Sequence, residues 1–354
     1  ERAVGVLMLC SGLGSILALP VSGWLCVKFG AKRVVYISGF LMATALLVIS
    51  LMVDPWLTGG MLMLFGACTI TIDVAANLNG VAMETRTGRR LMSGFHGGYS
   101  IGTLIGAGAM SALFAFGVIP LWAVVACMVP VLAAMVTGCR DLLPKEELLQ
   151  NDRTKEVKSN RLHIPPMVIV IGLVCFIMYA SEGAVMSWSA IFVSQERGVD
   201  MSVAGFFYTA FAVTMTAMRL LGDRIVEKIG QRRVVVYGAL MIASGLFMVA
   251  LIDNIFAAAV GFAFVGLGAA NIIPQLISFA AGIQGMAVHN IISLINALGY
   301  SGLLLGPVII GFVGKHYGLH MSFAGIAVLA LIVAMVLSVI LRNKQVTPQR
   351  TNKN

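Results

Sequence analysis

Lys28-Phe-Gly-Ala-Lys-Arg-Val-Val35 recurs as Lys228-Ile-Gly-Gln-Arg-Arg-Val-Val235, 200 positions further along the chain. Gly98-Tyr99-Ser100 recurs in the same way as Gly299-Tyr300-Ser301, at an offset of 201. Each copy of the longer pattern lies between two apolar runs that are long enough to be helices. The repeat therefore indicates two similar halves in parallel orientation.

The composition is that of a membrane protein. Of the 354 residues, 59% are hydrophobic and only 11% are charged, whereas soluble domains carry about 25% charged residues. A run of about 20 apolar residues spans a bilayer as a helix. Eleven such runs are predicted, at 3–27, 34–53, 58–83, 93–115, 119–138, 165–194, 201–222, 234–252, 255–284, 290–313 and 321–341. The expected fold class is an all-α membrane protein.

The positive charges are distributed unevenly along the chain. Of the 24 lysines and arginines, 20 lie in every second loop or in the C-terminal tail. The positive-inside rule makes these segments cytoplasmic, so we expect a bacterial inner-membrane protein whose C-terminus is cytoplasmic. The net charge of +9 is then a property of the loops and not a nucleic-acid footprint. With eleven spans and a cytoplasmic C-terminus, the chain would begin outside. This suggests that the first of twelve helices precedes Glu1.

The segment 140–164 is the only long polar stretch. We therefore expect an N-terminal bundle at 1–139 with helices 2–6, and a cytoplasmic linker at 140–164. A C-terminal bundle with helices 7–12 would follow at 165–342, and a cytoplasmic tail at 343–354.

Motifs for covalent or ATP-driven chemistry are missing from the sequence. It contains no GxxxxGK[ST] loop, zinc signature or nucleophile motif. The six cysteines have no paired spacing, so we interpret them as small hydrophobic residues. We expect neither an enzyme nor a bound cofactor or metal.

The loop patterns resemble the signature of the major facilitator superfamily. That signature is Gly, three residues, Asp, Arg or Lys, one residue, Gly, one or two residues, then Arg or Lys. The first copy supplies Gly23, Lys28, Gly30, Lys32 and Arg33, and the second supplies Glu227, Lys228, Gly230, Arg232 and Arg233. Val27 replaces the acid of the first copy, and Asp223 replaces the first glycine of the second. The resemblance implies two pseudo-symmetric helix bundles and a cytoplasmic gate at these loops.

A finer resemblance covers roughly 50 residues. Asp73-Val-Ala-Ala-Asn77 is similar to the acid-x-Ala-Ala-Asn segment of the fucose:proton-symporter-like members. The stretch GFHGGYSIGTLIGAG at 94–108 resembles the MosC branch, which is associated with rhizopine and inositol-like solutes. The resemblance implies transport of a sugar or polyol, with Asp73 as the protonatable acid of the cavity.

Polar residues inside the predicted spans are the candidate site. A carboxylate near the centre of a membrane helix costs roughly 2.5 to 3.5 kcal/mol and by default marks a substrate or proton pathway. Residues three or four apart share a helix face, so five spans each carry one polar stripe. Because lipid offers no hydrogen-bond partners, we expect these stripes to line one shared cavity.

Removal from water favours the neutral form of a carboxyl group, so a buried acid can exchange protons near neutral pH. We predict Asp73 as the first candidate for proton coupling and Glu182 as the second, unless Glu182 binds solute hydroxyls instead. The predicted solute-binding residues are Asn77, His96, Tyr99, Tyr179, Asn271, Gln275, Asn296 and Tyr300. Two alternatives stay open: a role for the amides in helix–helix contacts alone, and a role for the basic loops in topology alone.

The leading hypothesis is a secondary transporter that moves a small polar solute, a sugar or polyol, with protons by alternating access. We expect a monomer in the lipid bilayer. An exporter of drug-like or other apolar compounds is the nearest alternative, and it would need a more aromatic cavity with fewer amides. A non-transporting membrane sensor is the alternative of another class, and it would need a large soluble domain.

Overall fold

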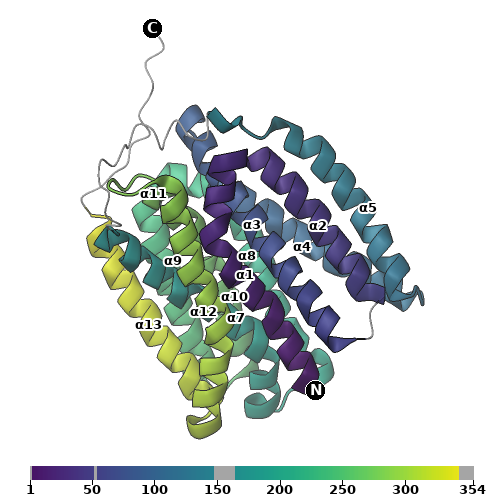
Figure 1. The fold of residues 1–354 in the computed structure, drawn as a ribbon. Helices are drawn as coiled ribbons and strands as arrows, with labels where there is room; N and C mark the ends of the chain where they lie inside the picture. The colour runs from purple at the N-terminus through teal and green to yellow at the C-terminus, as the bar shows by residue number, and fades with distance from the viewer. Residues whose placement is uncertain (1, 52–53, 147–163, 343–354) are drawn as a thin grey trace. The chain divides into compact units, whose positions relative to one another are not determined.

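The computed structural model describes residues 2–51, 54–146 and 164–342, and the ordered elements in these ranges are all helical (Figure 1). Most of the predicted linker and the tail at 343–354 lie outside the described residues. The elements are α1 (Arg2–Phe29), α2 (Ala31–Leu51), α3 (Pro55–Thr87), α4 (Met92–Ala115), α5 (Pro120–Gly138), the 3-10 turn η1 (Cys139–Asp141), α7 (Pro166–Arg197), α8 (Met201–Ile229), α9 (Gln231–Leu251), α10 (Ile255–Ala269), α11 (Ile272–Ala280), α12 (Val288–Tyr317) and α13 (Leu319–Ile340).

Eleven spans of the described chain are long and apolar enough to cross a membrane, which confirms the predicted number. Two of the turns between spans consist of a single glycine. Gly30 is the single residue between α1 and α2, and Gly230 is the single residue between α8 and α9. Their φ angles are +83° and +86°, values that glycine adopts without the steric cost of a Cβ. Asn254 caps α10, since its side chain accepts hydrogen bonds from the backbone N–H groups of Phe256 and Ala257.

The predicted helix 255–284 is wrong in one respect, because the structure interrupts it at Ala270 and Asn271. Pro274 has no backbone N–H and cannot donate to the carbonyl oxygen of Ala270, four residues earlier. The helix therefore continues as a separate element, α11, which begins at Ile272.

The helices form two compact units. Unit 1 consists of Glu1–Arg86, Tyr99–Pro165 and Ile283–Ala297, and unit 2 consists of Thr87–Gly98, Pro166–Gly282 and Leu298–Asn354. The first turns of α4 thus belong to unit 2, and the first turns of α12 belong to unit 1. The bundle boundaries expected from the polar linker remain a prediction.

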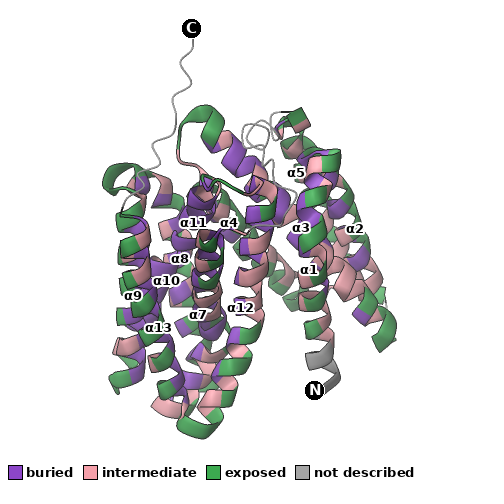
Figure 2. Cartoon of the chain, turned by 60° about the vertical axis from the view of Figure 1, so that its left-hand side comes forward, coloured by how far each residue is buried: buried purple, intermediate pink, exposed green. Residues whose placement is uncertain are grey.

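Small residues allow close helix packing in both units. In unit 1, a Cβ added at Gly14 would collide with the carbonyl of Met63, and one added at Gly66 would collide with that of Ser11, so α1 and α3 touch through their backbones. In unit 2, Gly245 of α9 and Gly261 of α10 face each other in the same way. Membrane helices associate through such contacts. Figure 2 shows buried residues along α7 and α10, and it shows that α9 and α13 each carry both buried and exposed residues.

We expect Gly245→Ala to destabilise the protein, because its methyl group would meet the Gly261 carbonyl oxygen. Overpacking of this kind costs about 1 to 3 kcal/mol. Gly325→Ala is the matched control, since a Cβ at Gly325 in α13 meets nothing within 4 Å. Thermal unfolding in detergent should show a lower midpoint for Gly245→Ala alone. Equal midpoints for the two variants would contradict the packing interpretation.

Candidate functional site

Asp73 of α3 is the centre of a polar cluster in unit 1. Its Oδ2 accepts hydrogen bonds from Nδ2 of Asn77 at 3.1 Å and from Nδ2 of Asn296 at 3.3 Å. Asn77 and Asn296 are 5% and 1% exposed, and Asp73 is half-buried. Asn77 lies one helical turn after Asp73, whereas Asn296 comes from α12. Two predicted solute-binding residues therefore hold the predicted coupling acid.

The packing of α1 against α12 supports this arrangement. A Cβ added at Gly23 would lie 2.5 Å from Oγ of Ser293 and 3.1 Å from the His289 carbonyl oxygen, so glycine allows the two helices to approach closely. Ser293 and Asn296 are three residues apart and share a face of α12. Gly23 lies inside α1, several residues before the turn at Gly30. The first residue of the loop motif thus acts within this unit as a helix-contact residue.

A second polar cluster lies in unit 2, at the break between α10 and α11. Nε of Arg219, in α8, donates to the Ala270 carbonyl oxygen at 3.3 Å. This is the oxygen that Pro274 leaves without its helical donor. Arg219 is only 8% exposed. A guanidinium group cannot lose its proton in a protein, so a permanent positive charge lies inside a span.

Glu182 and His96 belong to the same cluster. Arg219 lies near enough to interact electrostatically with both side chains. Glu182 is 7% exposed, and its Oε1 has no hydrogen-bond partner among the described residues. Buried polar atoms are nearly always hydrogen-bonded, so this oxygen is suited to a proton or a solute hydroxyl.

The amides of α11 extend this cluster. Gln275 is fully buried, and its Nε2 donates to Oγ of Ser93, in α4, at 3.1 Å. Nδ2 of Asn271 donates to the Met218 carbonyl oxygen at 3.1 Å. The side-chain oxygens of both amides, Oε1 and Oδ1, have no donor within the described part of the chain. Each amide is fixed by its NH₂ group and presents an acceptor oxygen.

The predicted aromatic residues divide into two groups. Tyr179 of α7 and Tyr300 of α12 stack with ring centroids 5.3 Å apart and an interplanar angle of 24°. Gly299 allows this, because a Cβ there would meet the Tyr179 ring. Tyr99 is 67% exposed and contributes to neither polar cluster.

The basic loop residues contact helix ends within their own units. Nζ of Lys32 donates to the Arg140 carbonyl oxygen at 2.9 Å, beyond the end of α5. Nη2 of Arg232 donates to the Ser338 carbonyl oxygen at 2.9 Å, near the end of α13. Cations are stabilised at such helix C-termini. Nζ of Lys28 lies 4.6 Å from the centroid of the Trp24 ring. The remaining charged residues of the motif, Arg33, Glu227, Lys228 and Arg233, are exposed.

Two residues of this region were not predicted as functional. Arg219 lies inside the predicted span 201–222, where an arginine is as costly as Asp73. Asp223 was noted only as a departure from the loop motif. Its carboxylate accepts hydrogen bonds from the backbone N–H groups of Ser93 at 3.0 Å and Gly94 at 2.8 Å. It therefore caps the beginning of α4, where negative charge is favourable.

Comparisons with known proteins agree on one family. The sequence pattern of the Major Facilitator Superfamily matches residues 1–281 and 171–354. An uncharacterized MFS-type transporter of Yersinia pestis is 37% identical over 336 residues, which cover 94% of this chain and 85% of that protein. The membrane protein MosC of Rhizobium meliloti is 29% identical over 338 residues, which cover 94% and 80%.

Solved structures show the same fold. The fucose:proton symporter of E. coli superposes with a TM-score of 0.77 at 15% identity, over 97% of this chain and 92% of that one. A human organic anion transporter superposes with a TM-score of 0.76 at 14% identity, over 94% and 83%. At these identities the likeness shows the fold alone.

Proposed function

This chain belongs to the Major Facilitator Superfamily and is a membrane transporter, and we propose that it moves a small polyhydroxylated solute together with protons. Transport is secondary and proceeds by alternating access. The protein lies in the bacterial cytoplasmic membrane as a monomer with its C-terminus in the cytoplasm. The charge distribution over the loops supports this orientation.

The observation that carries the proposed solute class is the set of acceptor oxygens in unit 2. Oε1 of Glu182, Oδ1 of Asn271 and Oε1 of Gln275 are buried and lack a donor among the described residues. A buried acceptor without a donor costs about 1 to 3 kcal/mol. Sugar and polyol hydroxyl groups would donate to these oxygens, whereas an apolar compound would leave them unsatisfied.

The cluster around Asp73 supports the proposed coupling. Two carboxamides from different helices hold its Oδ2. Hydrogen bonds to the charged form of an acid favour that form, while removal from water favours the neutral one. The proposal is consistent with the similarity of this chain to MosC in sequence and to the fucose:proton symporter in fold.

Uptake by proteoliposomes tests the proposed function. The purified protein is reconstituted and given radiolabelled myo-inositol, fucose or xylose, with or without an inward proton gradient. We expect accumulation of at least one of these solutes above the external concentration, only when the gradient is present. Accumulation that does not change when a protonophore is added would contradict proton coupling.

Export of an organic anion is the second candidate function. The buried Arg219 favours it, because a fixed cation inside a span attracts negative charge. In the same proteoliposomes, movement of an anionic dye without uptake of any polyol would favour this alternative.

A further inference from the structure

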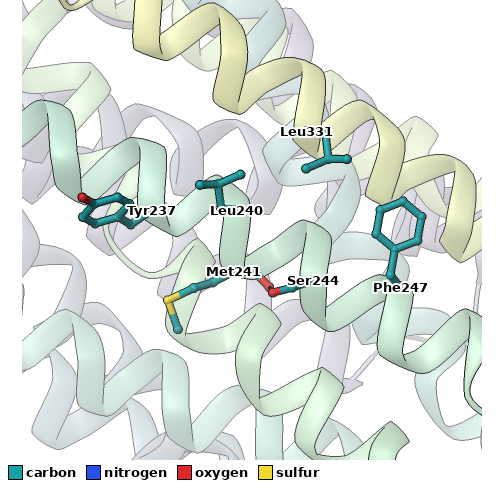
Figure 3. A pocket seen from close by; sticks show the side chains of 6 residues that line it. All are labelled: Tyr237, Leu240, Met241, Ser244, Phe247 and Leu331. Atoms are coloured by element: carbon teal, nitrogen blue, oxygen red, sulfur yellow. The ribbon is translucent and has the colours of Figure 1, made fainter.

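A groove on the outer side of α9 and α13 has no place in the mechanism above. It has a volume of about 560 Å³ and is lined by Tyr237, Leu240, Met241, Ser244, Phe247 and Leu331 (Figure 3). We propose that it is a binding site for one anionic phospholipid, which places an acyl chain in the groove and its phosphate at Arg233. The proposal depends on neither the solute nor proton coupling.

The lining of the groove suits a hydrocarbon chain. Tyr237, Leu240 and Leu331 are 54%, 42% and 36% exposed, so large apolar side chains face outward. The hydroxyl of Ser244 donates to the Met241 carbonyl oxygen at 3.0 Å, within its own helix. The Ser244 hydroxyl therefore needs no hydrogen-bond partner from a molecule in the groove. In a membrane-spanning chain such a surface is in contact with lipid.

The length of the groove matches one leaflet. Tyr237 and Phe247 are ten residues apart on α9, and a helix rises 1.5 Å per residue, so the groove extends about 15 Å. The hydrocarbon core of a bilayer is about 30 Å thick, and one acyl chain fills half of it. Tyr237 lies at the end nearer the start of α9, as expected for an aromatic residue at the membrane–water interface.

The charge at that end is positive. Arg233 lies one helical turn before Tyr237 and on the same face. It is exposed and forms no hydrogen bond or ion pair with the described residues. Arg232, next to it, is already bonded to the Ser338 carbonyl oxygen of α13, so α9 and α13 are held together where the headgroup would bind. Arg342, just after the end of α13, adds a second exposed cation.

Native mass spectrometry of the purified protein tests this site with phosphatidylglycerol as the probe and phosphatidylcholine as its neutral counterpart. Each basic residue near the membrane surface contributes roughly 1 kcal/mol to binding of anionic lipid, which is about fivefold in affinity. We therefore expect Arg233→Gln to weaken retention of one phosphatidylglycerol about fivefold. Arg224→Gln, an equal charge change at an exposed position in α8, should leave retention unchanged.

A second variant tests whether the acyl chain lies in the groove. Ser244→Trp fills the groove without changing charge, and we expect it to reduce phosphatidylglycerol retention as well. Val213→Trp, at a 53% exposed position in α8, is its control. Equal retention of both lipids by the wild type would overturn the proposal, as would an unchanged Arg233→Gln. Detection of a dimer that Ser244→Trp dissociates would assign the groove to a second copy of the chain instead.

Discussion

We expect Asp73→Asn to abolish gradient-driven accumulation while leaving solute binding in place. Asparagine keeps the size of the side chain and can still contact Asn77 and Asn296, but it cannot carry a proton. Each pH unit of gradient corresponds to about 1.4 kcal/mol, or tenfold accumulation for one proton per solute. With a gradient of about two units, the wild type should reach a ratio of up to roughly 100, and Asp73→Asn a ratio of about 1.

Counterflow separates a coupling defect from a folding defect. Proteoliposomes loaded with unlabelled solute exchange it for labelled solute without a proton gradient. We expect Asp73→Asn to retain this exchange, since the oxygens of unit 2 that we propose to bind solute are unchanged. Asn77→Ala is the matched variant, because it removes one donor to Asp73 and leaves the acid. If Asp73→Asn accumulates solute as the wild type does, Asp73 is not the coupling acid.

We expect the second large effect from Arg219→Leu, which should lower the stability of the protein. The substitution removes the donor to the Ala270 carbonyl oxygen. A buried acceptor that is left without a donor costs about 1 to 3 kcal/mol. Thermal unfolding of the purified protein should therefore show a clear decrease in the midpoint.

A double variant identifies the cause of that loss. Glu182→Gln/Arg219→Leu removes both members of the electrostatic interaction, so part of the stability should return. The measured coupling energy between the two sites should be about 1 to 3 kcal/mol. Arg224→Leu, at the exposed end of α8, should have an effect within about 0.5 kcal/mol. If the effects at Glu182 and Arg219 simply add, the two charges do not interact.

Local sequence rules predicted the parts of the fold that depend on nearby residues. Hydropathy gave the eleven spans, and the repeat pointed to the turns at Gly30 and Gly230. The spacing of Asp73 and Asn77 placed them on one face, and they form a hydrogen bond. These results follow from helix geometry and from the cost of polar groups in lipid, which act over a few residues.

The contacts between distant segments could not be derived in this way. Asn296 lies 223 positions from Asp73, and no periodicity connects them. The break before α11 depends on Pro274, and hydropathy does not reveal it because the apolar run continues on both sides of the proline. The cost of a charged side chain inside a span applies to Arg219 as well as to Asp73. The structure adds the hydrogen bond that Arg219 donates to the Ala270 carbonyl oxygen.

Labelling at Ala76 tests whether the polar faces of the spans border an aqueous passage and not lipid, because Ala76 is exposed and lies three residues after Asp73 on the same face of α3. In a variant whose six cysteines are replaced, Ala76→Cys and the 47% exposed Val328→Cys, near the middle of α13, are treated with a charged maleimide in proteoliposomes. We expect modification of position 76 and protection of position 328. Equal protection of both positions would mean that Ala76 does not face water.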